Sequence, residues 1–297
     1  MRDLAGKVAF ITGGASGVGF GMAQAFCSAG MRVAIADIRQ DHLDEAMKSF
    51  AGAAVHPIRV DVTDRDAMAR AADETERVFG KVHVVCNNAG INLFNDVGAA
   101  SYDDWDWILG VNLGGVVNGI QTFVPRIKAH GEGGHIVNTA SMAAFIASGI
   151  AGIYCTSKFA VRGMSEALRW SLRPHGIGVS VLCPGLVKST IYESETIRPP
   201  ELSADAVPSD PKFLESLARI HEFGMTPEEI GGKVLRAIQR NDFYIFSHPE
   251  FKQELRALFE EVLAAIPEDE PVPPQRLAFE EGRRERNAKA RAAWPTL

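Results

Sequence analysis

Two residues of the stretch Gly152–Val161, GIYCTSKFAV, could carry out proton chemistry. Tyr154 precedes Lys158 by four residues, about one helical turn, so in a helix both side chains leave the same face. A phenol beside an ammonium can release and regain a proton more readily, because the positive charge favours the phenolate. The same spacing also occurs in ordinary surface pairs, so the rest of the chain must decide the function of this pair.

A glycine-rich segment near the N-terminus is suited to a phosphate group. Thr12–Gly19 reads TGGASGVG and lies between an apolar run and a segment with helical periodicity. Glycines there let the backbone turn tightly and approach a pyrophosphate at the positive end of the following helix. We expect a dinucleotide site; a tight turn without a ligand is the alternative. The candidate contacts are Gly13, Ser16, Gly17, Val18 and Gly19.

An acidic residue, Asp37, ends the second apolar run, 18 residues beyond Gly19. A carboxylate there can accept hydrogen bonds from both hydroxyls of an adenosine ribose, and it would repel a 2′-phosphate. With its neighbour Ile38 it predicts NAD as the cofactor rather than NADP. Arg39 supports the alternative, because a guanidinium could bind the phosphate. Asp37 could also be only an acid at a helix N-terminus.

Polar turns follow the third and fourth apolar runs as well. Asp61 could accept a hydrogen bond from the adenine amino group, with Val62 beside the ring, whereas Asp64 could be only a helix cap. The sequence NNAG at 87–90 closes the fourth run, although Asn and Gly also favour ordinary turns.

Short apolar runs alternate with amphipathic, helix-like segments through the first 246 residues. Buried strands in this alternation are typical of a parallel sheet that helices cover on both faces. We therefore expect an α/β, doubly wound (Rossmann) fold with a mostly parallel seven-stranded sheet. The expected strands are Lys7–Thr12, Arg32–Asp37, Ala54–Val60, Val82–Asn87, His135–Ala140, Gly178–Cys183 and Asp242–Phe246.

The domain organisation follows from this alternation and from where it stops. We expect one catalytic, dinucleotide-binding domain over 1–247 and a C-terminal helical extension with a tail over 248–297. In the extension, apolar residues of 251–266 share one helical face, and the polar stretch Gln275–Trp294 is expected as a solvated helix or a disordered tail. Within the domain, 188–212 contains four prolines and is interpreted as a mobile loop near the active site.

The composition narrows the functional classes. The net charge of −6 gives no reason to expect nucleic acid as a partner. We find no secretory signal and no apolar run near the roughly 20 residues that span a bilayer, so we expect no membrane partner. The four cysteines lack metal-ligand spacing, which predicts no metal site and fits reduced thiols in a cytoplasmic protein.

In this order and spacing, the motifs resemble those of the classical short-chain dehydrogenase/reductase family. The set comprises the glycine loop, the acid after the second strand, NNAG, Ser141 at the end of the fifth strand, the Tyr154–Lys158 pair and Pro184–Gly185. The resemblance extends over about residues 4–246 and implies that the tyrosine and lysine are catalytic. Oxidation of an alcohol removes a hydride, which the cofactor accepts, and a proton, which a side chain accepts. A phenol needs its pKa lowered from about 10 for this role, and two neighbouring cations could lower it.

The resemblance also implies a role for each matching residue. Tyr154 is the acid/base, Lys158 lowers its pKa and holds the nicotinamide ribose, Ser141 positions the substrate oxygen, and Asn112 helps relay the proton to Lys158. Ser189 stands where the family often has threonine, so either its hydroxyl or that of Thr190 could reach the pyrophosphate. The further cofactor contacts implied by the resemblance are Asn88, Ala89, Gly90, Pro184, Gly185 and Val187.

Three longer stretches, Ala36–Met47, Tyr102–Arg126 and Gly133–Arg169, resemble the bacterial Cα-dehydrogenases of lignin-derived β-aryl ethers. This implies NAD-dependent oxidation of a benzylic secondary alcohol to a ketone. Apolar residues after the motifs would suit a bulky aromatic alcohol, although several could be ordinary core. These candidates are Leu93, Phe94, Phe145, Ile146, Leu186, Ile191 and Tyr192.

Two alternatives stay open at this point. The chain could oxidise another secondary alcohol, such as a hydroxysteroid or a terpene alcohol, or it could be a non-catalytic dinucleotide sensor. A sensor has no need of the proton acceptor Tyr154, which favours an enzyme. The family usually pairs its two long helices between subunits, so the resemblance also implies a homodimer or homotetramer.

Overall fold

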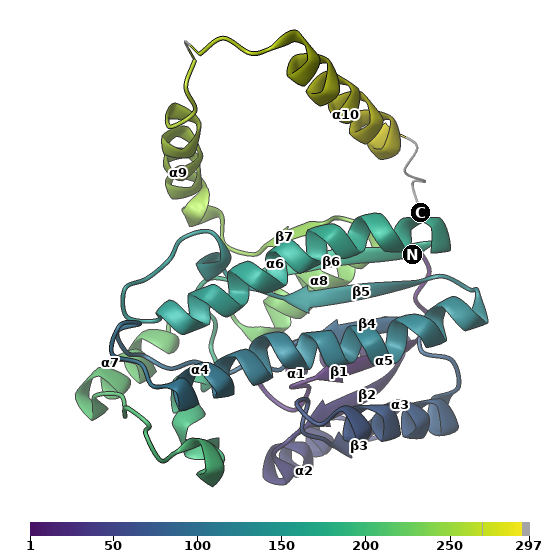
Figure 1. Ribbon diagram of the computed structural model, residues 1–297. Coiled ribbons are helices and arrows are strands. Elements are labelled where there is room, and N and C mark those ends of the chain that lie inside the picture. Colours follow the sequence, from purple (N-terminus) through teal and green to yellow (C-terminus); the bar gives the residue numbers. More distant parts are fainter. Residues whose placement is uncertain (269, 293–297) are drawn as a thin grey trace. The chain divides into compact units, whose positions relative to one another are not determined.

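The computed structural model describes residues 1–268 and 270–292 and centres on a seven-stranded sheet. The strand order is β3-β2-β1-β4-β5-β6-β7, and each neighbouring pair is parallel. The predicted doubly wound parallel sheet is confirmed (Figure 1). The strands are β1 Val8–Thr12, β2 Arg32–Asp37, β3 Val55–Arg59, β4 Val84–Asn87, β5 Gly134–Thr139, β6 Ile177–Cys183 and β7 Tyr244–Phe246.

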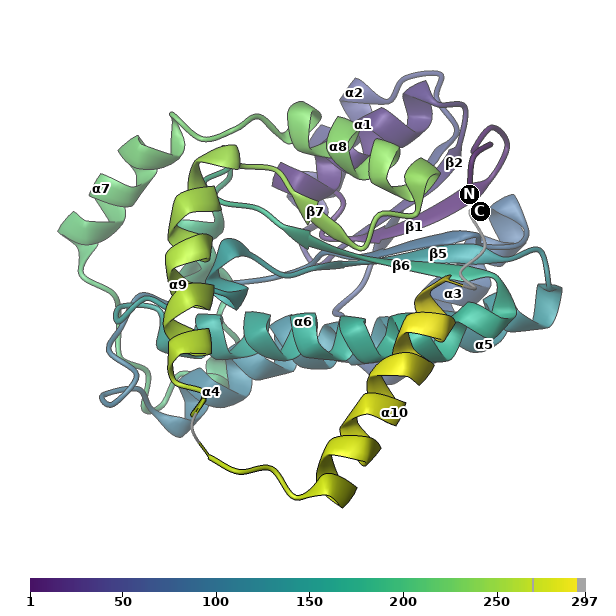
Figure 2. The same cartoon turned by 90° about the horizontal axis from the view of Figure 1, so that it is seen from above.

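Helices cover both faces of the sheet, with α1, α2 and α8 on one face and α3, α5 and α6 on the other (Figure 2). The predicted C-terminal helices are also present. The helix bounds are α1 Gly17–Ser28, α2 Gln40–Ser49, α3 Arg65–Phe79, α4 Tyr102–Leu109, α5 Gly115–His130, α6 Gly152–Leu172, α7 Pro211–His221, α8 Pro227–Arg240, α9 Lys252–Ala264 and α10 Pro274–Ala292.

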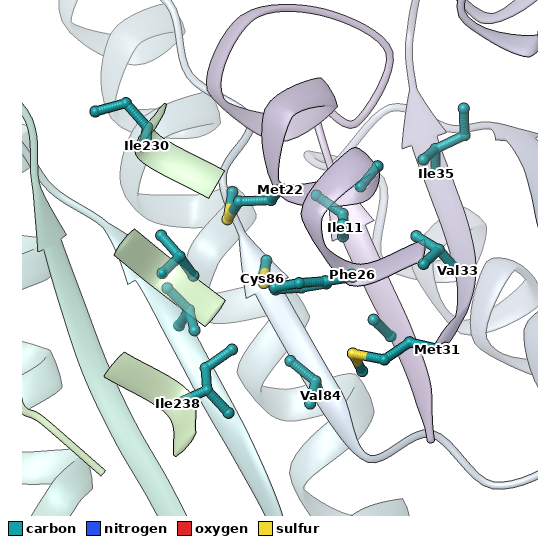
Figure 3. Packing of buried hydrophobic residues seen from close by; sticks show 14 of the residues in the cluster. Ile11, Met22, Phe26, Met31, Val33, Ile35, Val84, Cys86, Ile230 and Ile238 are labelled. Carbon is teal, nitrogen blue, oxygen red and sulfur yellow. The ribbon is translucent and has the colours of Figure 1, made fainter. Parts of the chain in front are cut away.

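The main core lies between the sheet and the α1–α8 pair (Figure 3). Met22 and Phe26 of α1 pack with Ile230 and Ile238 of α8 over apolar residues of β1, β2 and β4. The two helices meet at their backbones: a Cβ on Gly21 would lie 1.9 Å from the carbonyl oxygen of Pro227. Glycine at this crossing therefore sets how closely α8 approaches the helix that follows the glycine loop.

One long helical stretch, Tyr102–His130, combines α4, a π-helical turn at Gly110–Gly114 and α5. By length and composition alone this helix could span a membrane, because it has 29 residues and an 18-residue window with a mean hydropathy of 1.2. However, 56% of its most apolar window is buried inside the protein, as in the core helix of a globular domain. Glycines and polar residues such as Asn112, Asn118 and Gln121 interrupt its apolar residues, so it contains no long continuous apolar run.

The chain divides into two compact units, Met1–His248 and Pro249–Leu297. In the second unit, α9 and α10 contain no buried residue, and Phe259, Val262, Leu263 and Ile266 are exposed. The expected tail reaches Trp294, which lies outside the described residues.

Candidate active site

Tyr154 and Lys158 lie one turn apart in α6, as predicted from their spacing. The Lys158 side chain is 3% exposed, and its Nζ donates a hydrogen bond of 3.0 Å to the carbonyl of Thr139 at the end of β5. The same Nζ lies 5.4 Å from the centre of the Tyr154 ring. The end of β5 therefore holds the ammonium beside the phenol.

Burial shifts the pKa values of Tyr154 and Lys158 in opposite directions. Burial raises the pKa of Tyr154 to about 12, although a hydrogen bond with Ser141 opposes the rise. Burial lowers the pKa of Lys158 to about 8. The sequence-based expectation of a lowered phenol pKa relied on two cations, one of which belongs to the cofactor. Within the chain itself, the loss of hydration outweighs the hydrogen bond with Ser141, so the pKa of the phenol is raised.

Ser141 lies on the loop that follows β5, next to the phenol. Its Oγ accepts a hydrogen bond of 3.1 Å from the backbone N–H of Ala143, which starts a short 3₁₀ helix. Its hydroxyl also contacts the carbonyl oxygen of Pro184 at 3.5 Å. The ends of β5 and β6, together with α6, thus bring Ser141, Pro184 and Tyr154 together at the carboxyl edge of the sheet.

Asn112 occupies the π-helical turn between α4 and α5 and is fully buried. Its Oδ1 accepts from the backbone N–H of Ile91 at 2.8 Å, and its Nδ2 donates to the carbonyl of Ile91 at 2.9 Å and to Ser157 Oγ at 3.1 Å. These bonds use both amide hydrogens, so the side chain locks the turn in place. The two Nδ2 hydrogens are therefore not free to take part in a relay to Lys158.

The glycine loop has the shape that a pyrophosphate requires. A Cβ on Gly19 would lie 2.0 Å from the carbonyl oxygen of Gly13, and a Cβ on Gly13 would lie 2.9 Å from Ala89 Cα. Asn88 fixes the loop, because its Nδ2 donates to the carbonyls of Thr12 and Gly13 and its Oδ1 accepts from Thr139. The bare loop surface therefore leaves the following helix N-terminus open to an anion.

Gly90 continues this surface toward the catalytic pair. A Cβ at this position would lie 3.3 Å from Lys158 Nζ and 3.3 Å from Asn112 Oδ1. The NNAG turn thus connects the glycine loop with Lys158.

Asp37 ends β2 beside the glycine loop. Its carboxylate accepts hydrogen bonds from the backbone N–H groups of Ala15 at 3.3 Å and Arg39 at 3.1 Å. Burial raises its pKa, and these N–H groups oppose the rise. The Arg39 guanidinium, the group that could favour a 2′-phosphate, forms an ion pair with Asp41. Ile38, beside them, is exposed.

The adenine candidates lie at the end of β3. Asp61 Oδ1 accepts from the backbone and hydroxyl of Thr63 at 2.8 Å each, which leaves Oδ2 for another donor. Val62 is buried, and its carbonyl accepts a hydrogen bond of 2.8 Å from Asn118.

The segment after β6 is pinned on both sides. Gly185 N–H donates to His248 Nδ1 at 3.0 Å, and Val187 pairs with Met225 in a parallel bridge. Ser189 Cβ lies 3.3 Å from the Cβ position of Gly17, so Ser189 is next to the glycine loop, whereas Thr190 is exposed. The sequence analysis missed His248; its place directly after the last strand, at the carboxyl edge, was the available signal.

The candidate substrate residues fall into different surroundings. Phe94 meets Phe213 of α7 edge to face, with ring centres 5.6 Å apart, and Tyr192 lies 5.3 Å from the ring of His221. Leu93 instead belongs to a buried cluster with Trp107. Leu186, Ile191 and Ile146 are partly exposed.

Phe145 requires a correction. Its ring packs against Tyr244 and Phe246 of β7, and the Arg162 guanidinium lies 4.0 Å from the ring centre. The turn at Met142–Ala144 directs the ring toward the last strand, so we assign Phe145 to packing rather than to a substrate wall.

Part of the 188–212 segment, which we interpreted as a mobile loop, has regular local structure. Residues 191–197 and 200–202 form 3₁₀ turns with hydrogen bonds from Ser194 and Arg198, and α7 begins at Pro211.

Known proteins are similar to this chain in sequence and fold. A family model described as short chain dehydrogenase matches residues 7–199. A C alpha-dehydrogenase from Sphingobium sp. (strain NBRC 103272 / SYK-6) is 39% identical over 297 residues, which cover 99% of this chain and 95% of that protein.

Solved structures of other proteins are also similar to this chain. A short chain dehydrogenase/reductase from Burkholderia phymatum in complex with NAD is 34% identical, with a TM-score of 0.85, covering 92% of this chain and all of that chain. The apo form of LigO from Sphingobium sp. strain SYK-6 is 44% identical, with a TM-score of 0.79, covering 96% of this chain and 98% of that chain. Together with the placement of Tyr154 and Lys158 at the carboxyl edge of the sheet, these matches show that the chain belongs to the short-chain dehydrogenase family and is an alcohol-oxidising oxidoreductase.

Proposed function

We propose that the protein oxidises a bulky aromatic secondary alcohol to a ketone with NAD, and that its substrates include the benzylic Cα alcohol of lignin-derived β-aryl ether dimers. The observation that carries the proposal is the Tyr154–Lys158 pair, whose ammonium lies 5.4 Å from the phenol ring at the end of β5. The C alpha-dehydrogenase relative, matched over almost the full length of both chains, supports the substrate class.

The residues of the chain divide the chemistry among them. Ser141 holds the substrate oxygen near the Tyr154 hydroxyl, and Tyr154 as phenolate accepts the proton of the alcohol. The bound nicotinamide supplies the hydride acceptor and a positive charge. Lys158 adds its own charge beside the phenol and orients the nicotinamide ribose. The proton then passes by way of Lys158 to water, while the Asn112 side chain keeps the π-helical turn in place.

The cofactor site takes NAD because of Asp37. The carboxylate ends β2 next to the glycine loop, where a ribose would place its hydroxyls, and a 2′-phosphate would meet its charge. Arg39 offers little compensation, because Asp41 already engages its guanidinium. Gly13, Gly19 and Ser189 would border the pyrophosphate, and Asp61 with Val62 would border the adenine.

Aromatic residues favour a ring-bearing substrate over other secondary alcohols. Phe94, Phe213 and Tyr192 stand on segments that adjoin the catalytic edge, and aromatic rings pack well against one another. We further propose a cytoplasmic enzyme, which the four free cysteines support.

A substrate panel tests the proposal. The full chain is given NAD or NADP with a β-aryl ether dimer that carries a free Cα alcohol, a hydroxysteroid or a terpene alcohol, and formation of reduced cofactor is followed by absorbance. We expect kcat/KM to be highest for the dimer with NAD, and the ketone to be identified by mass. Higher kcat/KM for the steroid or the terpenol would contradict the substrate class. Binding of NAD without turnover of any alcohol would indicate a sensor.

A further inference from the structure

The segment Ile191–Leu202, directly after the nicotinamide-contacting residues, is tied to the opposite side of the site. Ser194 Oγ accepts a hydrogen bond of 3.0 Å from the backbone N–H of Asn92, which follows the NNAG turn. Ser194 is itself buried, and its hydroxyl donates to the carbonyl of Ile191 at 2.6 Å. The segment therefore has a fixed point near its start.

A buried ion pair forms the second fixed point. Arg198 Nη1 lies 2.6 Å from Asp104 Oδ1, and the two side chains are 7% and 0% exposed. The Arg198 Nε donates to the carbonyl of Leu202 at 2.5 Å, and its guanidinium carbon lies 5.0 Å from the centre of the Trp107 ring. Arginine suits this position because its planar group can pair with a carboxylate, donate to a carbonyl and stack on an indole at once.

Asp104 is rigid, which makes it a suitable anchor. It is the third residue of α4, and its Oδ2 accepts the backbone N–H of Ser101 at 2.9 Å in a capping box. Asn95 Nδ2 contacts the same oxygen at 3.4 Å. Arg198 Nη2 has no hydrogen-bond partner among the described residues, so the one carboxylate of Asp104 balances the buried guanidinium charge.

Apolar contacts link this pair to the catalytic helix. Ile197 and Leu202, on either side of the arginine, pack against a buried cluster that includes Trp107 and Ile153. Ile153 directly precedes Tyr154 in α6. A shift of the Ile191–Leu202 segment would thus change the packing of Ile153, the residue next to Tyr154.

The chain beyond Leu202 is held much less firmly. Helix α7 has no buried residue, and Phe223 just after it is 85% exposed. Its polar links to the rest of the chain include a 3.3 Å contact from Asp205 N–H to Asp103 and the contacts of the buried Ser209 with Glu195. At its far end, the ring of His221 forms a 2.8 Å hydrogen bond with the carbonyl of Val187. Local opening is easiest where few apolar contacts are buried.

We infer that Arg198 is a positioning residue: its ion pair with Asp104 fixes Ile191–Leu202 as a rigid wall of the substrate site and leaves the part from Ser203 to Ile220 free to close over a bulky alcohol. The inference rests on the proposed function for its kinetic consequence, but the rigid wall is a property of the protein alone. Removal of one partner leaves a buried, uncompensated charge, whereas replacement of both by apolar residues does not.

Amide exchange of the full chain tests the wall without any substrate. We expect 191–202 to exchange at least about tenfold more slowly than 204–220, and this difference to vanish in Asp104→Asn and in Arg198→Met. Equal exchange of the two parts in the unmodified protein would overturn the inference. If no alcohol is oxidised, the proposed function fails while this measurement still decides the wall.

Kinetics separate positioning from general stability. In Arg198→Met, we expect KM for the aryl ether alcohol to rise about tenfold while KM for NAD stays within about twofold. The double variant Asp104→Leu/Arg198→Met should regain the Tm lost by the single variants but keep the raised alcohol KM. Recovery of both Tm and alcohol KM in the double variant would mean that the pair only stabilises the fold, and would overturn the inference. Arg77→Met, which removes an exposed arginine 3.8 Å from Glu74, is the matched control and should change neither constant.

Discussion

The Lys158 ammonium lies 5.4 Å from the centre of the Tyr154 ring and is held there by the carbonyl of Thr139. The position of the charge is therefore set by the end of β5, one turn of α6 away from the phenol. Because burial raises the pKa of Tyr154 and lowers that of Lys158, the protein alone keeps the phenol protonated. Only an added positive charge near the ring would make the phenolate accessible near neutral pH.

Replacing Tyr154 by phenylalanine removes the proton acceptor and little else. We expect kcat/KM for the alcohol to fall at least about 100-fold, while Kd for NAD stays within about threefold. Steady-state kinetics and calorimetric titration measure the two quantities. Tyr102, which is 90% exposed on α4, offers the control variant Tyr102→Phe with unchanged kinetics. Activity of Tyr154→Phe close to that of the control would remove Tyr154 from the mechanism.

The buried lysine makes stability depend on pH in a defined direction. The pKa of Lys158 is lowered from 10.5 to about 8, so between these values the unfolded chain binds more protons and stability rises with pH. Above about pH 10.5 burial of Lys158 costs no stability, because the lysine is neutral in both the folded and the unfolded chain. As pH falls through about 8, the cost of burying its charge is fully felt and the free energy of unfolding decreases. Relative to Lys158→Met, the native chain should therefore gain about 2 kcal/mol in free energy of unfolding between pH 7.5 and 9.5. Urea unfolding of both proteins at the two pH values measures this gain. A difference that shrinks with rising pH would show that the lysine is not desolvated as described.

Asp37 should control the choice between NAD and NADP. Loss of its charge in Asp37→Asn removes the repulsion of a 2′-phosphate, so we expect the NAD/NADP ratio of kcat/KM to fall at least about tenfold. The matched variant Asp41→Asn frees the Arg39 guanidinium but leaves the Asp37 charge, and should lower the ratio much less. A larger effect of Asp41→Asn would identify Arg39 as the dominant group.

The outer side of α4 and α5 should be covered by a second copy of the chain. A hollow of about 560 Å³ lies there, lined by Leu109, Leu113 and Val117 among others, and Val117 is 37% exposed. We expect a dimer or tetramer by light scattering at micromolar concentration, and Val117→Glu should weaken it because a carboxylate would be buried at the interface. Val78→Glu, at a comparably exposed position on α3, is the control. A monomeric mass for the unmodified protein would contradict this assembly.

The motifs could be placed from the sequence because each follows a strand of one parallel sheet. Thr12, Asp37, Asn87 and Thr139 end β1, β2, β4 and β5, which are neighbours in the sheet. Parallel strands bring their carboxyl ends to one edge. The four-residue spacing of Tyr154 and Lys158 then predicted that both side chains share one face of a helix, because the geometry of a helical turn is local.

What escaped prediction depends on contacts between residues far apart in the chain. The Arg198–Asp104 pair joins positions 94 residues apart, and no local pattern marks either partner. The direction of Phe145 depends on a three-residue 3₁₀ turn that has no distinct sequence signal. The raised pKa of Tyr154 depends on how completely α6 is buried, which cannot be predicted from the local sequence.

The close approach of α1 and α8 also has a consequence for synthesis of the chain. Gly21 and Pro227 touch in the finished protein, but the ribosome makes them more than 200 positions apart. At about 5–20 residues per second, roughly 10–40 s separate their emergence. During that interval Met22 and Phe26 lack the partners Ile230 and Ile238 that later bury them. The nascent nucleotide-binding half is thus expected to expose an apolar helix face, a natural target for chaperones, until α8 leaves the exit tunnel.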